Sequence, residues 1–421
     1  MKVFKFGGAS VQNIDAIKNV ANIVRHYKDE KILIVISAIG KTTNALEAVA
    51  NAFYQHKKEE ALALFEQIKT THKDFAKYLL VKEATKTEQQ LSDFFTEVEW
   101  LLHDSPVRDY AYYYDQIVCI GELLSTLLVN AYLNEINIDT TWVDVRDYFR
   151  TDNNFREANI DMEFTTEKIH TLNQTFTQKN IIVTQGFIGC TQENESTTLG
   201  REGSDYSAAI IANILNAESV TIWKDVKGVL NADPKQFEEA TLLPNLSYNE
   251  VIEMAYYGAQ VIHPKTIKPL QNKNIPLLVK CFADISLPGT IIDNSLVKNL
   301  PPIIVIKQKQ VLVELTSKDF SFVGEKPTAT LYQIFASLKI KPNLTQMGAI
   351  TISLCMDDAT EKIEQLALAA AELFDVSVQK NVALLTIRHY NTTILEELTA
   401  DKNFILQQKT LETYQAIFTN K

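Results

Sequence analysis

The chain has 421 residues, of which 46% are hydrophobic and 22% are charged, and its formal net charge is −11 at pH 7. This composition is typical of a globular protein of two or three domains with a large core, and the acidic balance argues against a nucleic-acid partner. The four cysteines (Cys119, Cys190, Cys281 and Cys355) have no paired spacing, so we expect reduced thiols in a cytoplasmic protein. No apolar run reaches the ~18 residues of a membrane span, so we expect none, and we expect a strand and not a signal peptide at the first residues.

The first predicted element is a strand at residues 2–6, where polar and apolar residues alternate. Gly7-Gly8-Ala9-Ser10 interrupts it, and apolar residues then recur at helical spacing over residues 11–27. A strand, a glycine turn and a helix can cradle a phosphate, because glycine lets the backbone approach an anion closely. Lys5 precedes that turn, where its ammonium could reach a phosphate. Alone the motif is weak, since many strands end in Gly-Gly.

Strands then alternate with helices through the first two-thirds of the chain. The apolar run at 31–36 predicts a strand that is covered on both faces. Residues 44–104, rich in Ala, Leu, Glu, Lys and Gln, predict helices packed as an insert. We expect another helix at 116–134 and further strands at 140–145, 181–185, 219–223 and 275–280. This alternation predicts an α/β three-layer αβα sandwich with ligands at the carboxyl ends of the strands.

Residues 197–207 (TTLGREGSDYS) combine two glycines, an arginine and a carboxylate just before the apolar run 208–212. This order predicts a loop that ends in a helix, with Ser204 or Asp205 as the N-cap. The N–H groups at a helix start suit an anion, and Arg201 could bind a carboxylate or phosphate through two hydrogen bonds. Asp205 would not suit a simple anion site, but it could orient a cation or a metal that arrives with the anion.

Two common nucleotide motifs are absent. Residues 37–42 (SAIGKT) end like a P-loop, but Val35 stands where the first glycine is required. No G-x-G-x-x-G run follows a predicted strand, which excludes a dinucleotide fingerprint by motif. The histidines show no metal-ligand spacing, and we expect His263, which precedes Pro264, to belong to a structural turn.

The pattern changes at residues 294–302, where Pro301-Pro302 indicates a linker. Beyond it we expect a strand at 311–315, a helix at 327–338, strands at 342–346 and 350–356, a helix at 360–374 and a strand at 376–379. This β-α-β-β-α-β order is the ferredoxin-like arrangement. Residues 382–421 give only strand, helix, strand and strand, so a second module would need completion by a strand at 303–307 or by a partner chain.

Seven segments, taken in order, resemble those of the aspartate kinases, which belong to the amino-acid kinase family. The resemblance is to a monofunctional aspartate kinase with C-terminal ACT modules. The segments are KFGGAS at 5–10, VISA at 35–38, GELLS at 121–125, GFIG at 186–189, the 197–207 loop, WKDVKGV at 223–229 with ADP at 232–234, and YGAQVIHP at 257–264. The resemblance implies a catalytic domain at 1–293, an ACT regulatory module at 303–380 and an abridged second ACT module at 381–421.

The resemblance also implies ATP-dependent phosphorylation of the side-chain carboxylate of L-aspartate, the first step towards lysine, threonine and methionine. Lys5 and Asp205 would be catalytic, with Lys5 offsetting charge on the transferring phosphate. The acceptor would be bound by Ser37, Thr43, Glu122 (at the ammonium) and Arg201 (at the α-carboxylate). The nucleotide, with Mg²⁺ bound mainly through its phosphates, would contact Lys5, Gly7, Gly8, Ser204, Lys224, Asp225, Leu230, Lys235 and Gln260. The acceptor carboxylate is ionised at neutral pH, so no protein base is required.

Five positions depart from the family pattern: Glu202 replaces a usual glycine, Ala9 and Lys224 replace threonines, Lys235 replaces an arginine and Gln260 replaces a lysine. The detail of nucleotide binding therefore stays open. Lys224 or Lys227 could supply the charge that Gln260 lacks, and a nearby lysine could offset Glu202. The alternatives are a related kinase that acts on glutamate, acetylglutamate or a nucleoside monophosphate, and a catalytically weak amino-acid sensor.

ACT modules bind amino-acid effectors and pair into shared sheets, so the resemblance implies a homodimer or larger oligomer under feedback control. The effector segment would be residues 323–347. Met347-Gly348-Ala349 lacks the serine and the acidic pair of lysine-sensitive relatives. Asn343 could hydrogen-bond an amino-acid backbone, but it offers no full counter-charge for a lysine ammonium. We therefore expect control by a small amino acid, with lysine and threonine both open.

Overall fold

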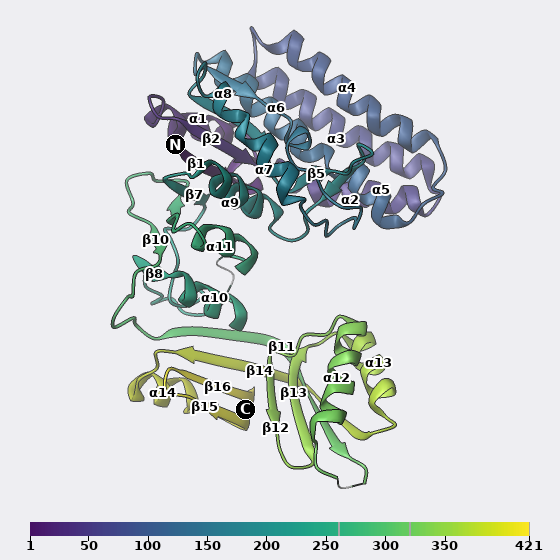
Figure 1. Cartoon of the computed structure of the whole chain (residues 1–421), viewed down its shortest axis with the longest axis vertical. Helices are drawn as coiled ribbons and strands as arrows, with labels where there is room; N and C mark the ends of the chain where they lie inside the picture. Colours follow the sequence, from purple (N-terminus) through teal and green to yellow (C-terminus); the bar gives the residue numbers. More distant parts are fainter. Residues whose placement is uncertain (260–261, 320, 421) are drawn as a thin grey trace. The chain divides into compact units, whose positions relative to one another are not determined.

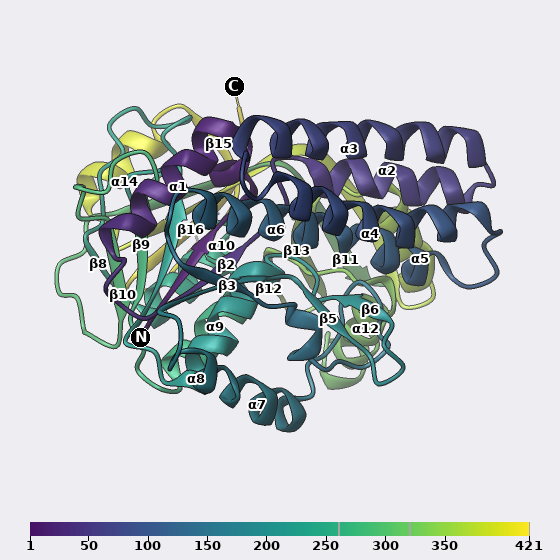
Figure 2. The same ribbon diagram turned by 90° about the horizontal axis from the view of Figure 1, so that it is seen from above.

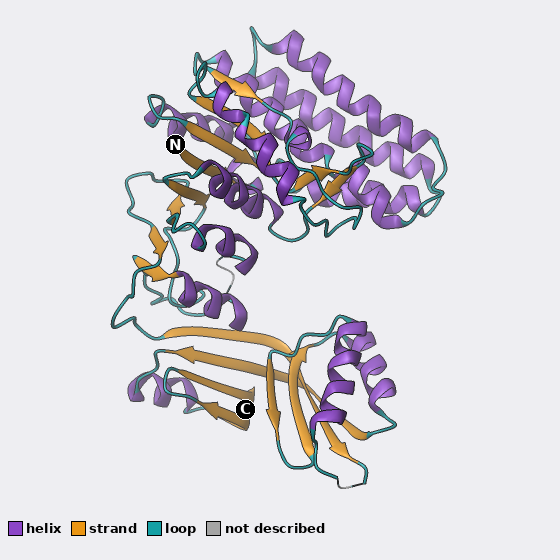
Figure 3. Cartoon of the chain, in the orientation of Figure 1, coloured by secondary structure: helices purple, strands orange, loops and turns teal. Residues whose placement is uncertain are grey.

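The computed structural model describes residues 1–259, 262–319 and 321–420, and it divides into two compact units, each with its own main sheet (Figures 1 and 3). The first unit comprises Met1–Val229, Leu242–Ile252 and Ile262–Leu296. The second comprises Leu230–Thr241, Glu253–Val261 and Val297–Lys421. The last division falls in the linker expected at 294–302, whereas the sequence does not predict that 230–241 and 253–261 group with the second unit.

Within the described residues, an eight-stranded sheet with the order β3-β4-β2-β1-β7-β9-β10-β8 forms the centre of the first unit. In this order, the six strands β3, β4, β2, β1, β7 and β9 are parallel to one another, and β10 is antiparallel to β9. Every residue of β2 is buried, as expected for a strand with both faces covered. The bounds are β1 Lys2–Phe6, β2 Ile32–Ile36, β3 Thr140–Trp142, β4 Ile181–Gln185, β7 Ser219–Lys224, β8 Asn245–Ser247, β9 Leu277–Cys281 and β10 Thr290–Asp293.

Helices lie on both sides of this sheet (Figure 2). Alternate strand residues such as Phe4, Phe6 and Ile34 form one core with α1 (Ile14–His26) and α6 (Ile120–Glu135). The opposite side of β1, which carries Lys5, contacts α9 (Gly203–Leu215), and α11 (Pro264–Gln271) packs on α9. Further helices of this part of the chain are α7 (Met162–His170), α8 (Leu172–Thr175) and α10 (Tyr248–Tyr257). The predicted αβα sandwich is confirmed.

The helical insert expected at 44–104 is also confirmed, as α2 (Thr42–Tyr54), α3 (Lys58–Leu79) and α4 (Ala84–His103). The helix expected at 116–134 starts earlier, as α5 (Tyr110–Val118), and is divided from α6 at Cys119. Together α5 and α6 form the one stretch among the described helices, Tyr110–Glu135, that is long and apolar enough to cross a membrane. Within the protein, 83% of its most apolar window is buried, which is the environment of a core helix.

Three smaller features differ from the expected elements. A 3-10 turn, η1 (Gly8–Val11), precedes α1. The strand expected at 140–145 ends at Trp142 and is followed by a second 3-10 turn, η2 (Val145–Asp147). A hairpin of β5 (Ile188–Cys190) and β6 (Ser196–Thr198), which the sequence analysis did not predict, leads into the 197–207 loop.

The second unit is built on an antiparallel sheet with the order β12-β13-β11-β14-β16-β15. Strands β11 and β14 are each 15 residues long, far longer than the strands expected at 311–315 and 376–379. The bounds are β11 Ile303–Ser317, α12 Glu325–Leu338, β12 Leu344–Met347, β13 Thr351–Asp357, α13 Thr360–Ala370, β14 Phe374–Arg388, α14 Thr392–Thr399, β15 Lys402–Lys409 and β16 Thr413–Asn420. The helix expected at 360–374 ends at Ala370, because Phe374 already pairs with Ser317 in the sheet.

The two long strands complete both halves of this sheet. The second half of β11 and the first half of β14 pair with each other beside β13 and β12, which gives the strand order of a ferredoxin-like module. The first half of β11 pairs Ile303–Lys307 with Arg388–Leu384. The second, shorter module therefore receives its missing strand from residues 303–307 of the same chain, which is one of the two completions expected from the sequence.

Candidate active site

The carboxyl end of β1 and the first turn of α9 bring together the two residues predicted to be catalytic. Lys5 Nζ lies 2.6 Å from Asp205 Oδ1, and the two side chains are 12% and 5% exposed. Asp205 is the third residue of α9, and Lys5 is the second-last residue of β1. The pair places a largely buried ammonium at the end of the sheet, where ligands of α/β folds bind.

The Gly7-Gly8 turn lies beside this ammonium and leaves little room for side chains. A Cβ on Gly8 would lie 2.8 Å from Gly40 O and 2.9 Å from Ala38 O. Glycine at position 8 therefore allows the turn after β1 to pack on the loop after β2, where Gly40 N–H donates to Gly8 O at 3.1 Å. A Cβ on Gly7 would lie 3.4 Å from Lys5 Nζ, so Gly7 keeps the approach to the ammonium open.

Two of the predicted hydroxyl residues meet at the same edge of the sheet. Ser37, directly after β2, donates from Oγ to Ser204 Oγ on α9 at 3.0 Å. Ser125 Oγ on α6 donates to Ser37 O at 2.7 Å and holds this strand end in place. Thr43 lies at the second position of α2 and is half-buried, and it makes no hydrogen bond to the other predicted residues within the described part of the chain.

Glu122 on α6 is buried with only one carboxylate oxygen hydrogen-bonded. Oε1 accepts the N–H of Ala38 at 3.2 Å, and Oε2 has no hydrogen-bond partner among the described residues. Burial raises the pKa of Glu122 to about 8, while the Ala38 hydrogen bond and the Lys5 charge act in the opposite direction. A buried carboxylate oxygen without a donor is costly. A cationic ligand group would supply the missing partner.

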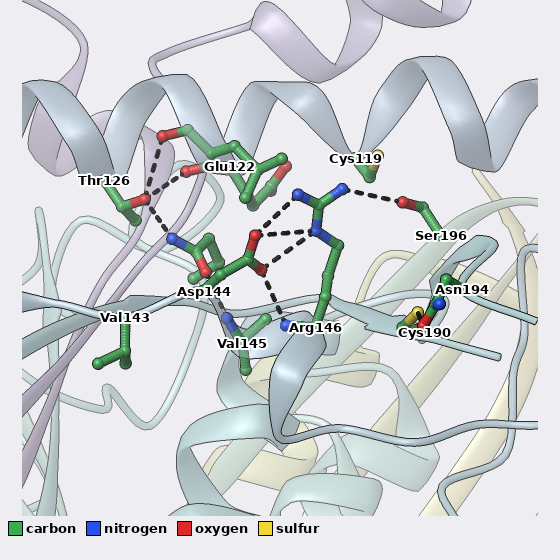
Figure 4. Close-up of polar contacts among 12 residues, drawn as sticks. Cys119, Glu122, Thr126, Val143, Asp144, Val145, Arg146, Cys190, Asn194 and Ser196 are labelled. Carbon is green, nitrogen blue, oxygen red and sulfur yellow. Dashed lines mark hydrogen bonds and ion pairs between the residues drawn. The ribbon is translucent and has the colours of Figure 1, made fainter. Parts of the chain in front are cut away.

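A polar network holds α6 from the side of β4 (Figure 4). Thr126 Oγ1 donates to Glu122 O at 2.9 Å and accepts from Gln185 Nε2 at 2.7 Å. Gln185, the last residue of β4, also accepts the N–H of Val145 at 2.7 Å. The Gln185 amide thus ties the turn of α6 that carries Glu122 to the end of the sheet.

Arg146, the residue after Val145, makes a further set of polar contacts (Figure 4). Its guanidinium pairs with Asp144 at 2.7 Å and donates to Ser196 Oγ at 3.3 Å. The arrangement links η2 to β6, whose last two residues are the first two of the segment 197–207. Neither Arg146 nor Gln185 belongs to a motif that the sequence analysis singled out.

The turn between β6 and α9 carries Arg201, whose side chain is exposed. The predicted N-cap at Ser204 or Asp205 is wrong. The helix begins at Gly203, and Glu202 takes the cap position with φ of +55° and no side-chain cap. Both predicted residues therefore lie inside the first turn, because the 197–207 loop closes two residues earlier than expected.

Glu202 and His263 form a contact that the sequence did not indicate. The Glu202 carboxylate accepts the N–H of His263 at 2.8 Å, so a backbone group offsets part of its charge. His263 Nδ1 accepts the N–H of Lys265 at 3.1 Å and caps α11. The structural turn expected at His263 is confirmed.

The residues predicted to bind the nucleotide fall in different parts of the structure. Lys5, Gly7, Gly8 and Ser204 lie at the sheet edge described above, whereas Lys224 ends β7 and Asp225 follows it, exposed. Leu230 and Lys235 belong to the second unit. Gln260 lies outside the described residues.

The side chain of Asn343, expected to be available for an effector, is used within the second unit. Its Oδ1 accepts from Lys307 Nζ at 2.7 Å, and its Nδ2 donates to Gln310 Oε1 at 2.7 Å and to Asp357 Oδ1 at 3.0 Å. Contact between Asn343 and an effector backbone stays a prediction. These contacts instead hold β12 to the middle of β11.

Residues 1–281 match the sequence model of the Amino acid kinase family. Aspartokinase 2 (chloroplastic) of Arabidopsis thaliana is 31% identical to the chain over 402 residues, which are 90% of the chain and 71% of that protein. The bifunctional aspartokinase/homoserine dehydrogenase 1 (chloroplastic) of the same plant is 35% identical over 298 residues, 69% of the chain. The chain spans about a third, 32%, of the length of this bifunctional relative.

Two crystal structures of Escherichia coli aspartokinase III share the fold over the whole chain. The complex of that protein with aspartate and ADP (R-state) has a TM-score of 0.81 and 26% identity, and the match covers 100% of this chain and 96% of that one. Its complex with lysine and aspartate (T-state) has a TM-score of 0.82 and 26% identity, with coverage of 99% and 95%.

Proposed function

This chain belongs to the aspartokinases of the amino acid kinase family, and we propose that it transfers the γ-phosphoryl group of ATP to the side-chain carboxylate of L-aspartate. An oxygen of that carboxylate forms the new bond to phosphorus, the bond to the β,γ-bridging oxygen breaks, and the products are 4-phospho-L-aspartate and ADP. The observation that carries the proposal is Glu122 Oε2, a buried carboxylate oxygen that lacks a partner among the described residues. The α-ammonium of an amino acid is the natural ligand for it.

In this reaction the protein positions two anions and offsets their charge. Glu122 binds the ammonium of aspartate, Arg201 binds its α-carboxylate, and Ser37 and Thr43 orient the acceptor. Lys5 lies close enough to Glu122 for its charge to lower the pKa of that carboxyl. The ammonium of Lys5 therefore offsets the negative charge of the transferring phosphate, next to the bound acceptor.

On the nucleotide side, Asp205 orients Lys5, and the backbone at Gly7 and Gly8 with the Ser204 hydroxyl receives phosphate oxygens at the start of α9. Further nucleotide contacts are assigned to Lys224, Asp225, Leu230, Lys235 and Gln260. Among the described residues no group of three metal-ligating side chains occurs. Mg²⁺ is accordingly assigned to the ATP phosphates, where it neutralises their charge.

We assign residues 1–293 to the catalytic domain, 303–380 to a regulatory ACT module and 381–421 to an abridged second module. Amino-acid feedback fits the second unit, and the E. coli relative crystallised with lysine in its T-state supports it. Homodimers or larger oligomers would form through these modules. The four cysteines, all buried and unpaired, support a reducing compartment such as the cytoplasm.

The test measures ADP release with Mg²⁺-ATP and a panel of acceptors. We expect turnover with L-aspartate, and kcat/KM lower by about 10²-fold or more for succinate and N-acetyl-L-aspartate, which leave the buried Glu122 oxygen unpaired. Faster turnover with glutamate, acetylglutamate or a nucleoside monophosphate would identify the related kinase instead. ATP binding without turnover on any acceptor would identify the amino-acid sensor.

A further inference from the structure

Asp115 on α5 is a buried carboxylate with no role in the reaction described above. Its side chain is 0% exposed. The charge of Arg156 acts on it, but the Arg156 guanidinium lies 3.7 Å from Glu47 instead. Burying a carboxylate without a cation partner is costly. The hydrogen bonds that it accepts therefore indicate which part of the structure it stabilises.

Both oxygens of Asp115 accept hydrogen bonds, and the donors lie on two loops. Oδ2 accepts the N–H of Arg156 at 2.9 Å and the N–H of Thr198 at 2.8 Å, and Oδ1 accepts the Thr198 hydroxyl at 2.7 Å. Thr198 ends β6, three positions before Arg201. Arg156 has φ of +72° and lies in the loop before α7. One side chain therefore joins α5 to both loops.

The two loops also contact each other directly. Ala158 N–H donates to Thr198 O at 3.0 Å. Gly200 has φ of +76°, and a Cβ there would lie 3.2 Å from Arg156 O. The backbone that leads to Arg201 therefore rests on the loop at 156–158, which Asp115 holds.

The next residues are fixed up to the start of α9. Leu199 N–H donates to Phe187 O at 2.8 Å, and Lys265 Nζ donates to Leu199 O at 3.1 Å. Gly203 N–H closes the turn onto Gly200 O at 3.1 Å. These bonds present the exposed Arg201 side chain from a backbone that is anchored on both sides.

We propose that Asp115 is a positioning residue that, by holding Thr198 and Arg156, fixes the turn from which Arg201 binds the α-carboxylate of the acceptor. Only this last step rests on the proposed function. Asp115 lies at the buried end of the contacts and touches neither reacting group. Loosening the turn would misplace the arginine, so it should weaken binding of aspartate more than binding of ATP.

The test compares Asp115→Ala, Asp115→Asn and a matched control, Asp109→Ala, which removes an exposed acid without a cap hydrogen bond from the start of the same helix. Alanine removes all three accepted hydrogen bonds, and we expect the KM for aspartate to rise about tenfold or more while the KM for ATP changes by less than about twofold. Asparagine retains an oxygen for the two N–H groups and an amide that can donate to the Thr198 hydroxyl. We therefore expect Asp115→Asn to restore most of the affinity for aspartate.

Repeating Asp115→Ala in an Arg201→Ala background tests whether the effect passes through Arg201. There we expect less than about a twofold further rise in the aspartate KM. An equal rise in both backgrounds would overturn the proposal. If Asp115→Ala fails to fold, Thr198→Val removes one of the three bonds, and the same comparison is made with a smaller expected rise.

Hydrogen exchange without substrate separates this inference from the proposed function. We expect faster exchange of the amides at 198–203 in Asp115→Ala, with exchange in β1 and β2 unchanged. Unchanged exchange at 198–203 would overturn the positioning role, whichever acceptor the enzyme uses. Wild-type protein that releases no ADP with aspartate would overturn the proposed function alone.

Discussion

Lys5 and Asp205 depend on each other, because each is largely buried and the other is its charge partner. We expect Lys5→Ala and Asp205→Ala each to lower kcat by about 10²–10³, the usual loss when a group that stabilises transition-state charge is removed. Steady-state kinetics on protein with a native circular-dichroism spectrum would measure it. Lys2→Ala, which removes a lysine of the same strand that pairs with Glu30, is the control. Near wild-type activity in Lys5→Ala would move the phosphate site elsewhere.

Glu122 predicts a pH dependence of substrate binding. Its pKa is raised to about 8, so at pH 7 the free enzyme holds it mostly protonated, whereas the aspartate ammonium needs the ionised form. The KM for aspartate should therefore fall as the pH rises towards 8, by about tenfold for each pH unit well below that value. Kinetics between pH 6 and 8 on wild type and Glu122→Gln would show it. The variant should have a higher KM that does not depend on this ionisation.

At the scale of residues, the sequence predicts the motif positions better than their surroundings. Lys5, Ser37 and Asp205 stand in recognisable segments, and parallel strands then bring those segments to one edge. Asp115 and Gln185 have no such signal. They act through hydrogen bonds to backbone N–H groups and a threonine hydroxyl, and such partners are set by the fold and leave no spacing in the chain.

At the scale of elements, α3 carries a buried histidine that limits stability in acid. His72 is 0% exposed, its Nδ1 lies 2.7 Å from Ile68 O, and its Nε2 has no hydrogen-bond partner among the described residues. Burial lowers the pKa of His72 to about 4. Between its unfolded pKa of about 6.5 and that value, the unfolded chain binds a proton that the native protein does not, so stability is lost as the pH falls.

We therefore expect the free energy of unfolding of the first unit to fall by about 2 kcal/mol between pH 7 and pH 5 because of His72. By pH 4 the total fall from this residue should be about 3 kcal/mol. Urea unfolding monitored by tryptophan fluorescence would measure it, because Trp100, Trp142 and Trp223 all lie in this unit. His72→Leu should remove this part of the pH dependence, and His103→Leu, at an exposed position on α4, should not. Equal pH dependence in both variants would contradict the assignment.

Strands with strong patterns are predicted closely, and β4 occupies the expected residues 181–185. The lengths of β11 and β14 are not predicted. Residues 307–310 (KQKQ) and 379–381 (QKN) are polar and read as connections. They lie inside long strands because the residues around them pair across the sheet: Lys307 pairs with Leu384, Gln310 with Val382 and Gln379 with Leu312, with register shifts in between. Such pairing leaves no local pattern. The early end of α13 is equally unmarked, since neither glycine nor proline follows Ala370.

At the scale of the whole molecule, the second unit includes segments predicted to contact the nucleotide. Arg388 on β14 pairs with Glu253 at 3.2 Å, and a Cβ on Gly258 would lie 2.1 Å from Lys307 Cε on β11. Asn231 O accepts the N–H of Ile304 at 2.8 Å. The segments at 230–241 and 253–259 therefore share their packing with the proposed regulatory sheet.

An effector bound to that sheet should consequently change the affinity for the nucleotide. We expect a small amino acid to change the KM for ATP with a coupling free energy of about 1–3 kcal/mol, reciprocal between effector and nucleotide for binding. Titrations of ATP and aspartate at saturating lysine, threonine or methionine would measure it. If none of these amino acids changes the affinity for ATP or aspartate, the second unit serves only in assembly. Strong inhibition by lysine alone would show that the sequence from Met347 to Ala349 accommodates a lysine ammonium without the usual acidic pair.

The two 15-residue strands have a consequence for how the C-terminal region can be divided. The boundary proposed at 380/381 separates two modules by resemblance, yet it cuts through β14, and the opening residues of β11 belong to the later module. A truncation at that boundary would leave Ile303–Lys307 as an unpaired edge strand, and such strands promote aggregation. The modules are thus inseparable as pieces, and evolution or an engineer can exchange them only together.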